Sequence, residues 1–225
     1  MSSAGPPQGA NCSPSGGSAA TSAASVGALI YLHGFRSSSQ GIKATALRAA
    51  IGVLPAHERP ALWVPDLPHR PSAAIARIAQ HVEAGGDPAG VTFIGSSLGG
   101  YYATHLAERY GARAVLINPA IRPYDDLKPY RGVQVNMYSG ESFEVGDVHF
   151  DELAQLRVAK ITRPARYLLL VETGDEVLDY REAVAFYGGA WQFVQGGGDH
   201  ACQGFIAQIP AILRFADAVA ARGEP

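Results

Sequence analysis

The stretch 93–100 reads Phe93-Ile94-Gly95-Ser96-Ser97-Leu98-Gly99-Gly100. It overlaps the short apolar run 91–94, whose β-branched and aromatic residues predict a buried strand. It leads into residues 98–110, where Leu, Tyr, Leu and Tyr recur every four positions and predict a helix. A Gly-x-Ser-x-Gly pattern between a strand and a helix indicates a sharp turn that exposes the central serine, Ser97.

The glycines of this turn have a steric reason. Gly95 and Gly99 stand two residues on either side of Ser97, where the backbone is crowded and only very small side chains fit. The N–H groups at the start of the helix would favour negative charge that develops beside the serine. The alternative is a glycine-rich turn with an incidental serine, but the flanking strand and helix favour a nucleophile elbow.

The composition of the chain indicates which kinds of binding partner and which cellular compartment to expect. The 225 residues include 18 Lys and Arg against 20 Asp and Glu, a net charge of −2 that gives no reason to expect nucleic acid or an anionic membrane as partner. No apolar run is long enough for a membrane span. Two cysteines, Cys12 and Cys202, cannot form a disulfide framework, so we expect a reducing, cytoplasmic setting. The oligomeric state is not indicated.

Residues 1–26 differ in composition from the rest of the chain. They consist almost entirely of Ser, Ala, Gly and Pro, without the basic and apolar regions of a secretory signal. We expect a disordered tail there and a single domain over residues 27–222.

Apolar runs predict five further strands, at residues 28–32, 61–64, 114–117, 167–171 and 191–194. Helical patterns lie between most of them. Strands that alternate with helices, about six strands in all, predict an α/β fold: a mainly parallel sheet with helices on both faces, in three layers.

Several details of the helices follow from local patterns. In residues 41–54 one helical stripe is predicted to face inward, namely Ile42, Ala46, Ala50 and Val53. Ser72 is expected to cap the next helix, and Pro210 to be the first residue of the last one.

Residues 120–165 are the least regular part of the domain. One short helix is predicted at 151–160. A connection of this length usually has a function, so we interpret it as a partial lid over the site; a plain surface excursion is the alternative.

Polar residues follow four of the predicted strands: the His33-Gly34 pair, Ser97, Asp175 and His200. In open α/β sheets, sites form beyond the carboxyl ends of the strands. The order Ser, Asp, His is that of the α/β-hydrolase triad. His200 would take the Ser97 proton, and Asp175 would orient the histidine.

Other residues compete for these roles. His105 lies on the predicted helix 98–110, and the remaining histidines lack a matching strand end, so surface or core positions are the simpler interpretation. Asp179 is four residues beyond Asp175 and is expected to be helical. Cys202 lies near His200 without an elbow around it, which favours a small buried residue.

The loop after the first strand resembles the oxyanion loop of α/β-hydrolases. The N–H groups of Phe35 and Leu98 are the predicted oxyanion donors, and Gly34 would let the backbone approach the substrate oxygen. Arg36 would hold an anionic substrate group, although a solvated loop arginine is the more ordinary interpretation. For the His33 side chain we expect a structural role. No cluster has metal-ligand spacing and no nucleotide-binding glycine motif is present, so neither a metal nor a cofactor is predicted.

Taken together, the motifs resemble those of the YqiA-like bacterial esterases, a branch of the α/β-hydrolases. The stretches that carry the resemblance are Tyr31-Leu32-His33-Gly34-Phe35, residues 94–104, Asn118-Pro119-Ala120-Ile121-Arg122-Pro123, residues 173–180 and Gly198-Asp199-His200-Ala201. The resemblance spans about residues 28–220. It implies an intracellular serine esterase for simple acyl esters, with acyl-CoA thioesters as a second substrate class, and the triad Ser97, Asp175 and His200.

The sequence therefore predicts a serine hydrolase that acts on a small-molecule acyl ester through an acyl-enzyme. The alternative is a non-catalytic protein that binds a small molecule or a partner on a hydrolase fold, because folds host several functions.

Overall fold

The structure, a computed structural model, describes residue 1 and residues 27–218, so nearly all of the predicted tail lies outside the described residues. Its centre is a six-stranded sheet of β1 (Leu29–Leu32), β2 (Leu62–Trp63), β3 (Thr92–Ser96), β4 (Arg113–Ile117), β7 (Tyr167–Glu172) and β8 (Trp191–Gln195). The order is β2-β1-β3-β4-β7-β8, and every neighbouring pair is parallel. This confirms the predicted α/β class.

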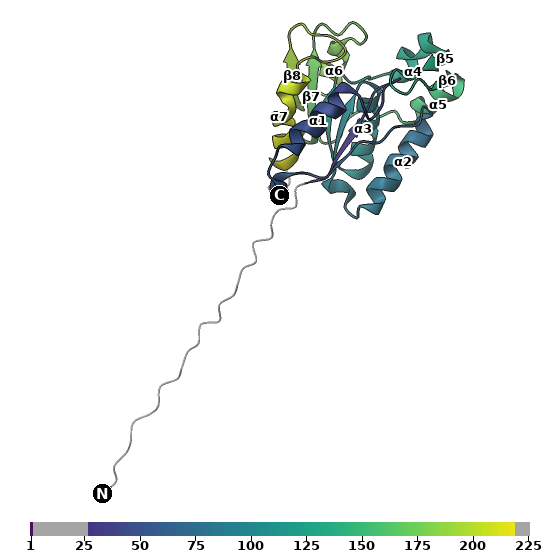
Figure 1. The fold of residues 1–225 in the computed structure, drawn as a ribbon. Coiled ribbons are helices and arrows are strands. Elements are labelled where there is room, and N and C mark those ends of the chain that lie inside the picture. Colours follow the sequence, from purple (N-terminus) through teal and green to yellow (C-terminus); the bar gives the residue numbers. More distant parts are fainter. Residues whose placement is uncertain (2–26, 219–225) are drawn as a thin grey trace.

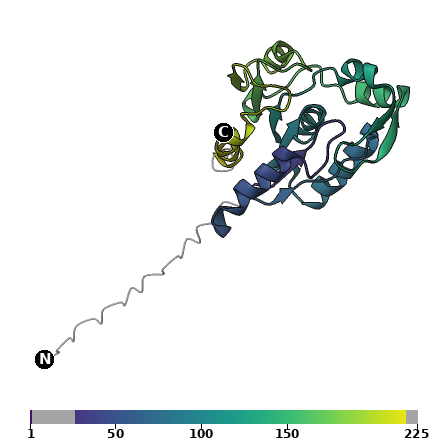
Figure 2. The ribbon, with the colours of Figure 1, turned by 45° about the horizontal axis from the view of Figure 1, so that its top comes forward.

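Helices cover both faces of this sheet (Figures 1 and 2). On one face lie α1 (Ile42–Gly52) and α7 (Phe205–Ala218), and on the other α2 (Pro71–Ala84), α3 (Leu98–Tyr110) and α6 (Tyr180–Phe186). Side chains alternate along a strand, so Leu29 and Tyr31 join the core under α1 and α7, whereas Ile30 and Leu32 join the core under α2 and α3. Three layers with two apolar cores result.

The chain reverses its direction across the sheet after β2. It runs from β1 outward to β2, and then returns to place β3 on the other side of β1. Loops that follow β1 and β3 therefore diverge to opposite faces, which opens a crevice at the carboxyl ends of these two strands. The turn at Ser97 and the loop at Gly34 both lie at this point.

The segment between β4 and β7 is more ordered than its sequence suggests. It contains α4 (Pro123–Asp126), an antiparallel hairpin of β5 (Gly132–Val135) and β6 (Ser142–Val145), and α5 (Asp147–Gln155). These elements lie above α2 at the upper right of Figure 1. The predicted helix at 151–160 was therefore placed too late, because it starts at Asp147, where the Gly146 N–H donates to His149 Nδ1 at 3.2 Å. Short 3-10 helices lie at Ala56–Glu58, Pro88–Gly90, Lys128–Tyr130 and Pro164–Arg166.

The predicted inner face of α1 is confirmed for Ala46 and Ala50, which are partly buried against the core, but it is wrong for Ile42 and Val53. Ile42 and Val53 are 75% and 84% exposed, whereas the buried side chains are Ala44, Leu47 and Ile51. Apolar residues cover most of the helix circumference, so two stripes satisfy the helical period. The stripe that carries the larger side chains towards the sheet is the one that packs.

Two helix starts also differ from the prediction. Ser72 does not cap α2: the helix begins at Pro71, and the carboxylate of Glu152 accepts the Ser72 N–H at 3.1 Å. Pro210 lies inside α7, which begins at Phe205. Because Pro210 and Ile206 are both exposed, water can solvate the carbonyl that loses its helical donor. Within residues 27–218, no helix has the length and apolar character needed to cross a membrane.

Candidate active site

Ser97 lies on a strained turn between β3 and α3. Its φ of 53° and ψ of −120° are rare for a residue with a side chain, and its N–H donates to the Ile117 carbonyl. A Cβ on Gly95 would lie 2.2 Å from the Gly99 carbonyl oxygen, and one on Gly99 would lie 2.0 Å from the Leu32 oxygen. Both positions therefore require glycine, because the turn brings three backbone segments together.

Ser97, His200 and Asp175 form one chain of hydrogen bonds. Ser97 Oγ lies 3.1 Å from His200 Nε2, and His200 Nδ1 lies 2.9 and 3.0 Å from the two carboxylate oxygens of Asp175. A carboxylate only accepts, so Nδ1 carries the proton of the neutral ring. Nε2 is then left to accept the Ser97 hydroxyl proton. The structure thus brings together the three residues that the sequence selected.

Asp175 is buried in an environment that favours its charged form. Its side chain is 2% exposed, and its Oδ1 accepts the N–H groups of Val177 and Leu178 at 2.9 Å each. Burial by itself raises the pKa of this carboxyl, but the hydrogen bonds from His200, Leu178 and Val177 outweigh it and hold the pKa below its usual range. The Asp175 carboxylate is therefore ionised at neutral pH, and in that form it can orient His200.

The competing residues have other partners. Asp179 is the N-cap of α6 and accepts the Arg181 N–H at 3.0 Å. The Nδ1 atom of His105 lies 3.0 Å from the Leu156 carbonyl. Cys202 is 5% exposed, and burial together with nearby Glu172 raises the pKa of its thiol to about 11. A thiol at that pKa is protonated and is a poor nucleophile.

Sequence reasoning missed two residues that hold the His200 loop. The buried Glu172 carboxylate accepts the N–H groups of Asp199, Gln203 and Gly204 at 2.9, 3.1 and 2.7 Å. Asn118 donates through Nδ2 to the Asp199 carbonyl at 2.9 Å and accepts the Glu172 N–H at 3.0 Å. A buried polar residue at the end of an apolar strand is the signal that could have identified both.

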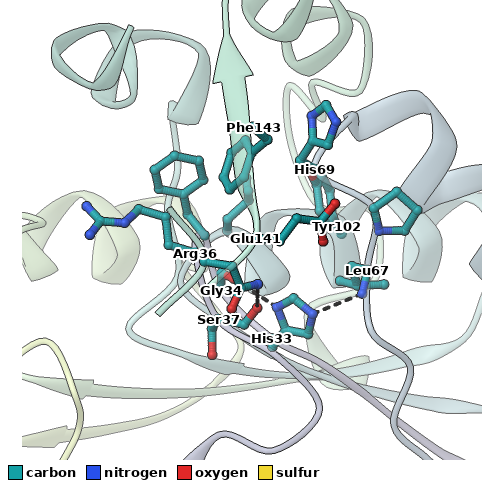
Figure 3. Close-up of a pocket in the computed structure, with 13 residues that line it drawn as sticks. His33, Gly34, Arg36, Ser37, Leu67, His69, Tyr102, Glu141 and Phe143 are labelled. Atoms are coloured by element: carbon teal, nitrogen blue, oxygen red, sulfur yellow. Dashed lines mark hydrogen bonds between the residues drawn. The ribbon is translucent and has the colours of Figure 1, made fainter. Parts of the chain in front are cut away.

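His33 fixes the loop that follows β1. The Leu67 N–H donates to His33 Nε2 at 3.0 Å, so Nδ1 carries the ring proton and donates to the Gly34 carbonyl at 2.9 Å (Figure 3). In a trans peptide the next N–H points away from that carbonyl, so this contact fixes the direction of the Phe35 N–H. Burial lowers the pKa of His33, which keeps the ring neutral. The expected structural role of His33 is confirmed.

Gly34 lies directly against the serine. A Cβ there would be 3.2 Å from Ser97 Cβ and 3.8 Å from Oγ. Leu98 is the first residue of α3, so its N–H has no acceptor within the helix. The two predicted donors therefore follow directly on Gly34 and Ser97, two residues that lie against each other.

A cavity of about 220 Å³ lies next to these residues (Figure 3). Gly34, Phe35, Arg36 and Leu98 line it, whereas Ser97 and His200 are not among its lining residues. Arg36 has a φ of 58°, and its Nε donates to the Val135 carbonyl at 3.2 Å, so its side chain is attached to the β5–β6 hairpin. Among residues 27–218, no group of three His, Cys, Asp or Glu side chains is arranged to hold a metal ion.

Comparison with solved structures gives the same fold. Est1E from Butyrivibrio proteoclasticus is 16% identical with a TM-score of 0.64, over 87% of this chain and 89% of that chain. Alpha/beta hydrolase domain-containing protein 10 from mouse is 17% identical with a TM-score of 0.64, over 85% and 90%. The monoacylglycerol lipase of Paleococcus ferrophilus is 15% identical with a TM-score of 0.64, over 86% and 95%. These similarities show an α/β-hydrolase fold.

A family model matches residues 28–217, which is nearly all of the described chain, and it is described as "Uncharacterised protein family (UPF0227)". This agrees with the resemblance to the YqiA-like branch that the five motifs carry. The chain is therefore a member of the UPF0227 family, and it has an α/β-hydrolase fold.

Proposed function

We propose that the protein is a serine esterase that hydrolyses small carboxylic acyl esters through an acyl-enzyme on Ser97. The observation that carries this proposal is the continuous hydrogen-bonded chain from Ser97 Oγ through His200 to the buried Asp175. The strained elbow and the fixed loop at Gly34 support it, because both place polar backbone beside the serine. The solved hydrolases with this fold are consistent with such chemistry.

The first half-reaction forms the acyl-enzyme. His200 Nε2 takes the hydroxyl proton as Ser97 Oγ attacks the ester carbonyl carbon. The carbonyl oxygen becomes an oxyanion, which the N–H groups of Phe35 and Leu98 stabilise. When the tetrahedral intermediate collapses, the ester C–O bond breaks and His200 gives its proton to the departing alkoxide.

Water completes the cycle. It loses a proton to His200, attacks the acyl carbon and releases the free acid, while Ser97 Oγ recovers its proton. The Asp175 carboxylate stabilises the imidazolium in both halves. The same residues could hydrolyse oxygen esters and acyl thioesters, so both kinds of substrate should be assayed.

Hydrolysis of p-nitrophenyl acetate by the wild type and by Ser97→Ala tests the proposal. We expect the variant to lose about 10⁴-fold or more in kcat, because the nucleophile is removed while the fold remains. Ser72→Ala, an exposed serine on α2, is the matched control and should keep the wild-type rate. Hydrolysis that survives in Ser97→Ala would overturn the proposal, and a wild type without activity on esters or thioesters would favour the non-catalytic binding protein.

A further inference from the structure

The cavity that Gly34 and Leu98 line, next to Ser97 in the fold and in the chain respectively, has three walls (Figure 3). The loop 33–37 after β1 forms the first, and residues 67–69 after β2 form the second. The β5–β6 hairpin supplies the third through Asn136, Glu141 and Phe143, while Leu98 and Tyr102 of α3 also line the cavity. We name this space the acyl cavity. We propose that it binds the acid part of the substrate and favours compact acyl groups that carry an aromatic ring; this rests on the proposed esterase function.

The position of His200 decides which half of the ester enters the acyl cavity. His200 Nε2 must reach the oxygen of the leaving alcohol, and this histidine comes from the loop after β8. The cavity is lined instead by the loops after β1 and β2, by the start of α3 and by the β5–β6 hairpin, which is hydrogen-bonded to the loop after β1. The strand β8 lies at the opposite edge of the sheet from β2. With the alcohol beside His200, the acyl substituent on the tetrahedral carbon points to the opposite side, into the cavity.

The volume sets how much of the acyl group the cavity can enclose. A cavity of about 150 Å³ holds a benzene ring, or roughly 25 Å³ for each carbon atom. By that ratio the 220 Å³ of the acyl cavity accommodates roughly nine non-hydrogen atoms. Beyond the carbonyl, the phenylethyl part of a 3-phenylpropanoyl ester has eight carbon atoms and fits within this limit, whereas the eleven-carbon chain of a dodecanoyl ester exceeds it.

Aromatic rings make up much of the wall. The Phe143 ring stacks on His69 with centroids 5.1 Å apart and planes at 19°. Phe143 also meets Phe35 edge to face, at 5.9 Å and 90°. His69 is held in turn by His149, with Nδ1 and Nε2 3.1 Å apart. Fixed rings attract another ring more than an alkyl chain of equal size, because faces and edges carry complementary charge.

The charged groups at the cavity favour a neutral acyl group. Arg36 and Glu141 both line it, so a charged end would be attracted to one side chain and repelled by the other. These opposed charges do not favour the predicted anionic group at Arg36. We instead assign to Arg36 the task of joining the first wall to the third.

The third wall is fixed to the first by three hydrogen bonds. The Met137 N–H donates to the Arg36 carbonyl at 2.9 Å, and Asn136 Nδ2 donates to the Ser37 carbonyl at 2.9 Å. Arg36 Nε donates to the Val135 carbonyl at 3.2 Å. Phe143 therefore keeps a constant position relative to Gly34, and the size of the cavity is set before substrate binds.

The test compares kcat/KM for the p-nitrophenyl esters of acetate, octanoate, 3-phenylpropanoate and dodecanoate. In the wild type we expect 3-phenylpropanoate to exceed octanoate by about 3- to 10-fold, the ratio typical of an aromatic contact, and dodecanoate to be the poorest of the longer esters. Phe143→Ala should abolish the preference for the aromatic ester, so that the ratio of kcat/KM for 3-phenylpropanoate to that for octanoate falls to about one or below. Phe143→Leu, which keeps an apolar side chain but removes the ring, should also abolish it.

Val133→Ala is the matched control, because Val133 lies on the same hairpin and is 73% exposed. It should keep the wild-type ratio. Octanoate preferred over 3-phenylpropanoate, efficient hydrolysis of dodecanoate, or an unchanged ratio in both Phe143 variants would overturn the inference. If acetate is hydrolysed in a Ser97-dependent manner but the aromatic preference is absent, only this inference fails. If the wild type does not hydrolyse acetate at all, the result would instead count against the proposed esterase function.

Discussion

Glu172→Gln is predicted to weaken both the fold and the catalytic step. The Glu172 side chain is 1% exposed, and its two oxygens accept three backbone N–H groups from the loop around His200. A glutamine offers one oxygen and one NH₂ group. In either orientation of the amide, the NH₂ group faces at least one of the three N–H donors.

The contacts give the size of the effect. One hydrogen bond to a charged acceptor is lost, at about 1.5–3 kcal/mol, and the others lose their charge assistance. Relief of the buried charge offsets part of this cost, so we expect a net loss of about 2–3 kcal/mol in the free energy of unfolding. For a chain of this size the loss lowers Tm by about 4–12 °C.

The same change should reduce kcat. Glu172 accepts the N–H groups of Asp199, Gln203 and Gly204, which lie on both sides of His200 in the chain, so a looser loop places Nε2 less accurately against Ser97. We expect kcat for p-nitrophenyl acetate to fall about tenfold or more while KM stays similar. The assays are thermal unfolding followed by circular dichroism and steady-state kinetics. Glu144→Gln, an exposed position on β6, is the control. A Tm and a kcat both equal to those of the wild type would show that the His200 loop does not depend on the Glu172 carboxylate.

Three further changes test other parts of the site and fold. Asp175→Asn should lower kcat by about 10³- to 10⁴-fold, because an amide no longer stabilises the imidazolium; a rate close to wild type in steady-state kinetics would contradict this. Gly34→Ala places a Cβ 3.2 Å from that of Ser97, so kcat/KM for p-nitrophenyl acetate should fall about 10- to 100-fold; an unchanged value would show that this approach is not needed. The hydrogen bond from Arg70 lowers the pKa of Glu152 from 4.5 to about 2, so its ionised form stabilises the fold above pH 4.5 and this stabilisation is lost as the pH falls towards 2. Glu152→Gln should therefore lower Tm at neutral pH, and its Tm should fall less steeply than that of the wild type as the pH drops from 4.5 towards 2. Because Arg70 is 40% exposed, the stabilisation lost is about 1 kcal/mol. A thermal-unfolding profile against pH that equals that of the wild type would argue against this.

The central sheet could be predicted from the sequence because its strands are buried on both faces. Continuous apolar runs such as 91–94 and 167–171 are too short for core helices and too apolar for surface loops. The turn at Ser97 was recognisable as well, because two of its positions admit only glycine. In a parallel sheet the order of strand ends then places Ser97, Asp175 and His200 at one edge. The distances between these three residues agree with that expectation. Their catalytic roles stay a proposal.

Other features depend on contacts that no local pattern records. Both stripes of α1 are apolar, and only the packing against the sheet selects Leu47 over Ile42. The start of α2 depends on Glu152, which is 80 residues away from Ser72 in the chain. The β5–β6 hairpin has one face against the domain, and its short strands alternate too weakly to be separated from loop sequence.

Covalent labelling shows whether Ser97 is the nucleophile without reliance on any chosen substrate. The native protein is treated with an alkyl fluorophosphonate, and the modified residue is identified by peptide mass spectrometry. We expect a single adduct on Ser97 Oγ, loss of ester hydrolysis in proportion to labelling, and no adduct in Ser97→Ala. An adduct on a different residue, or a fully labelled Ser97 with undiminished hydrolysis, would contradict the assignment of Ser97 as the nucleophile.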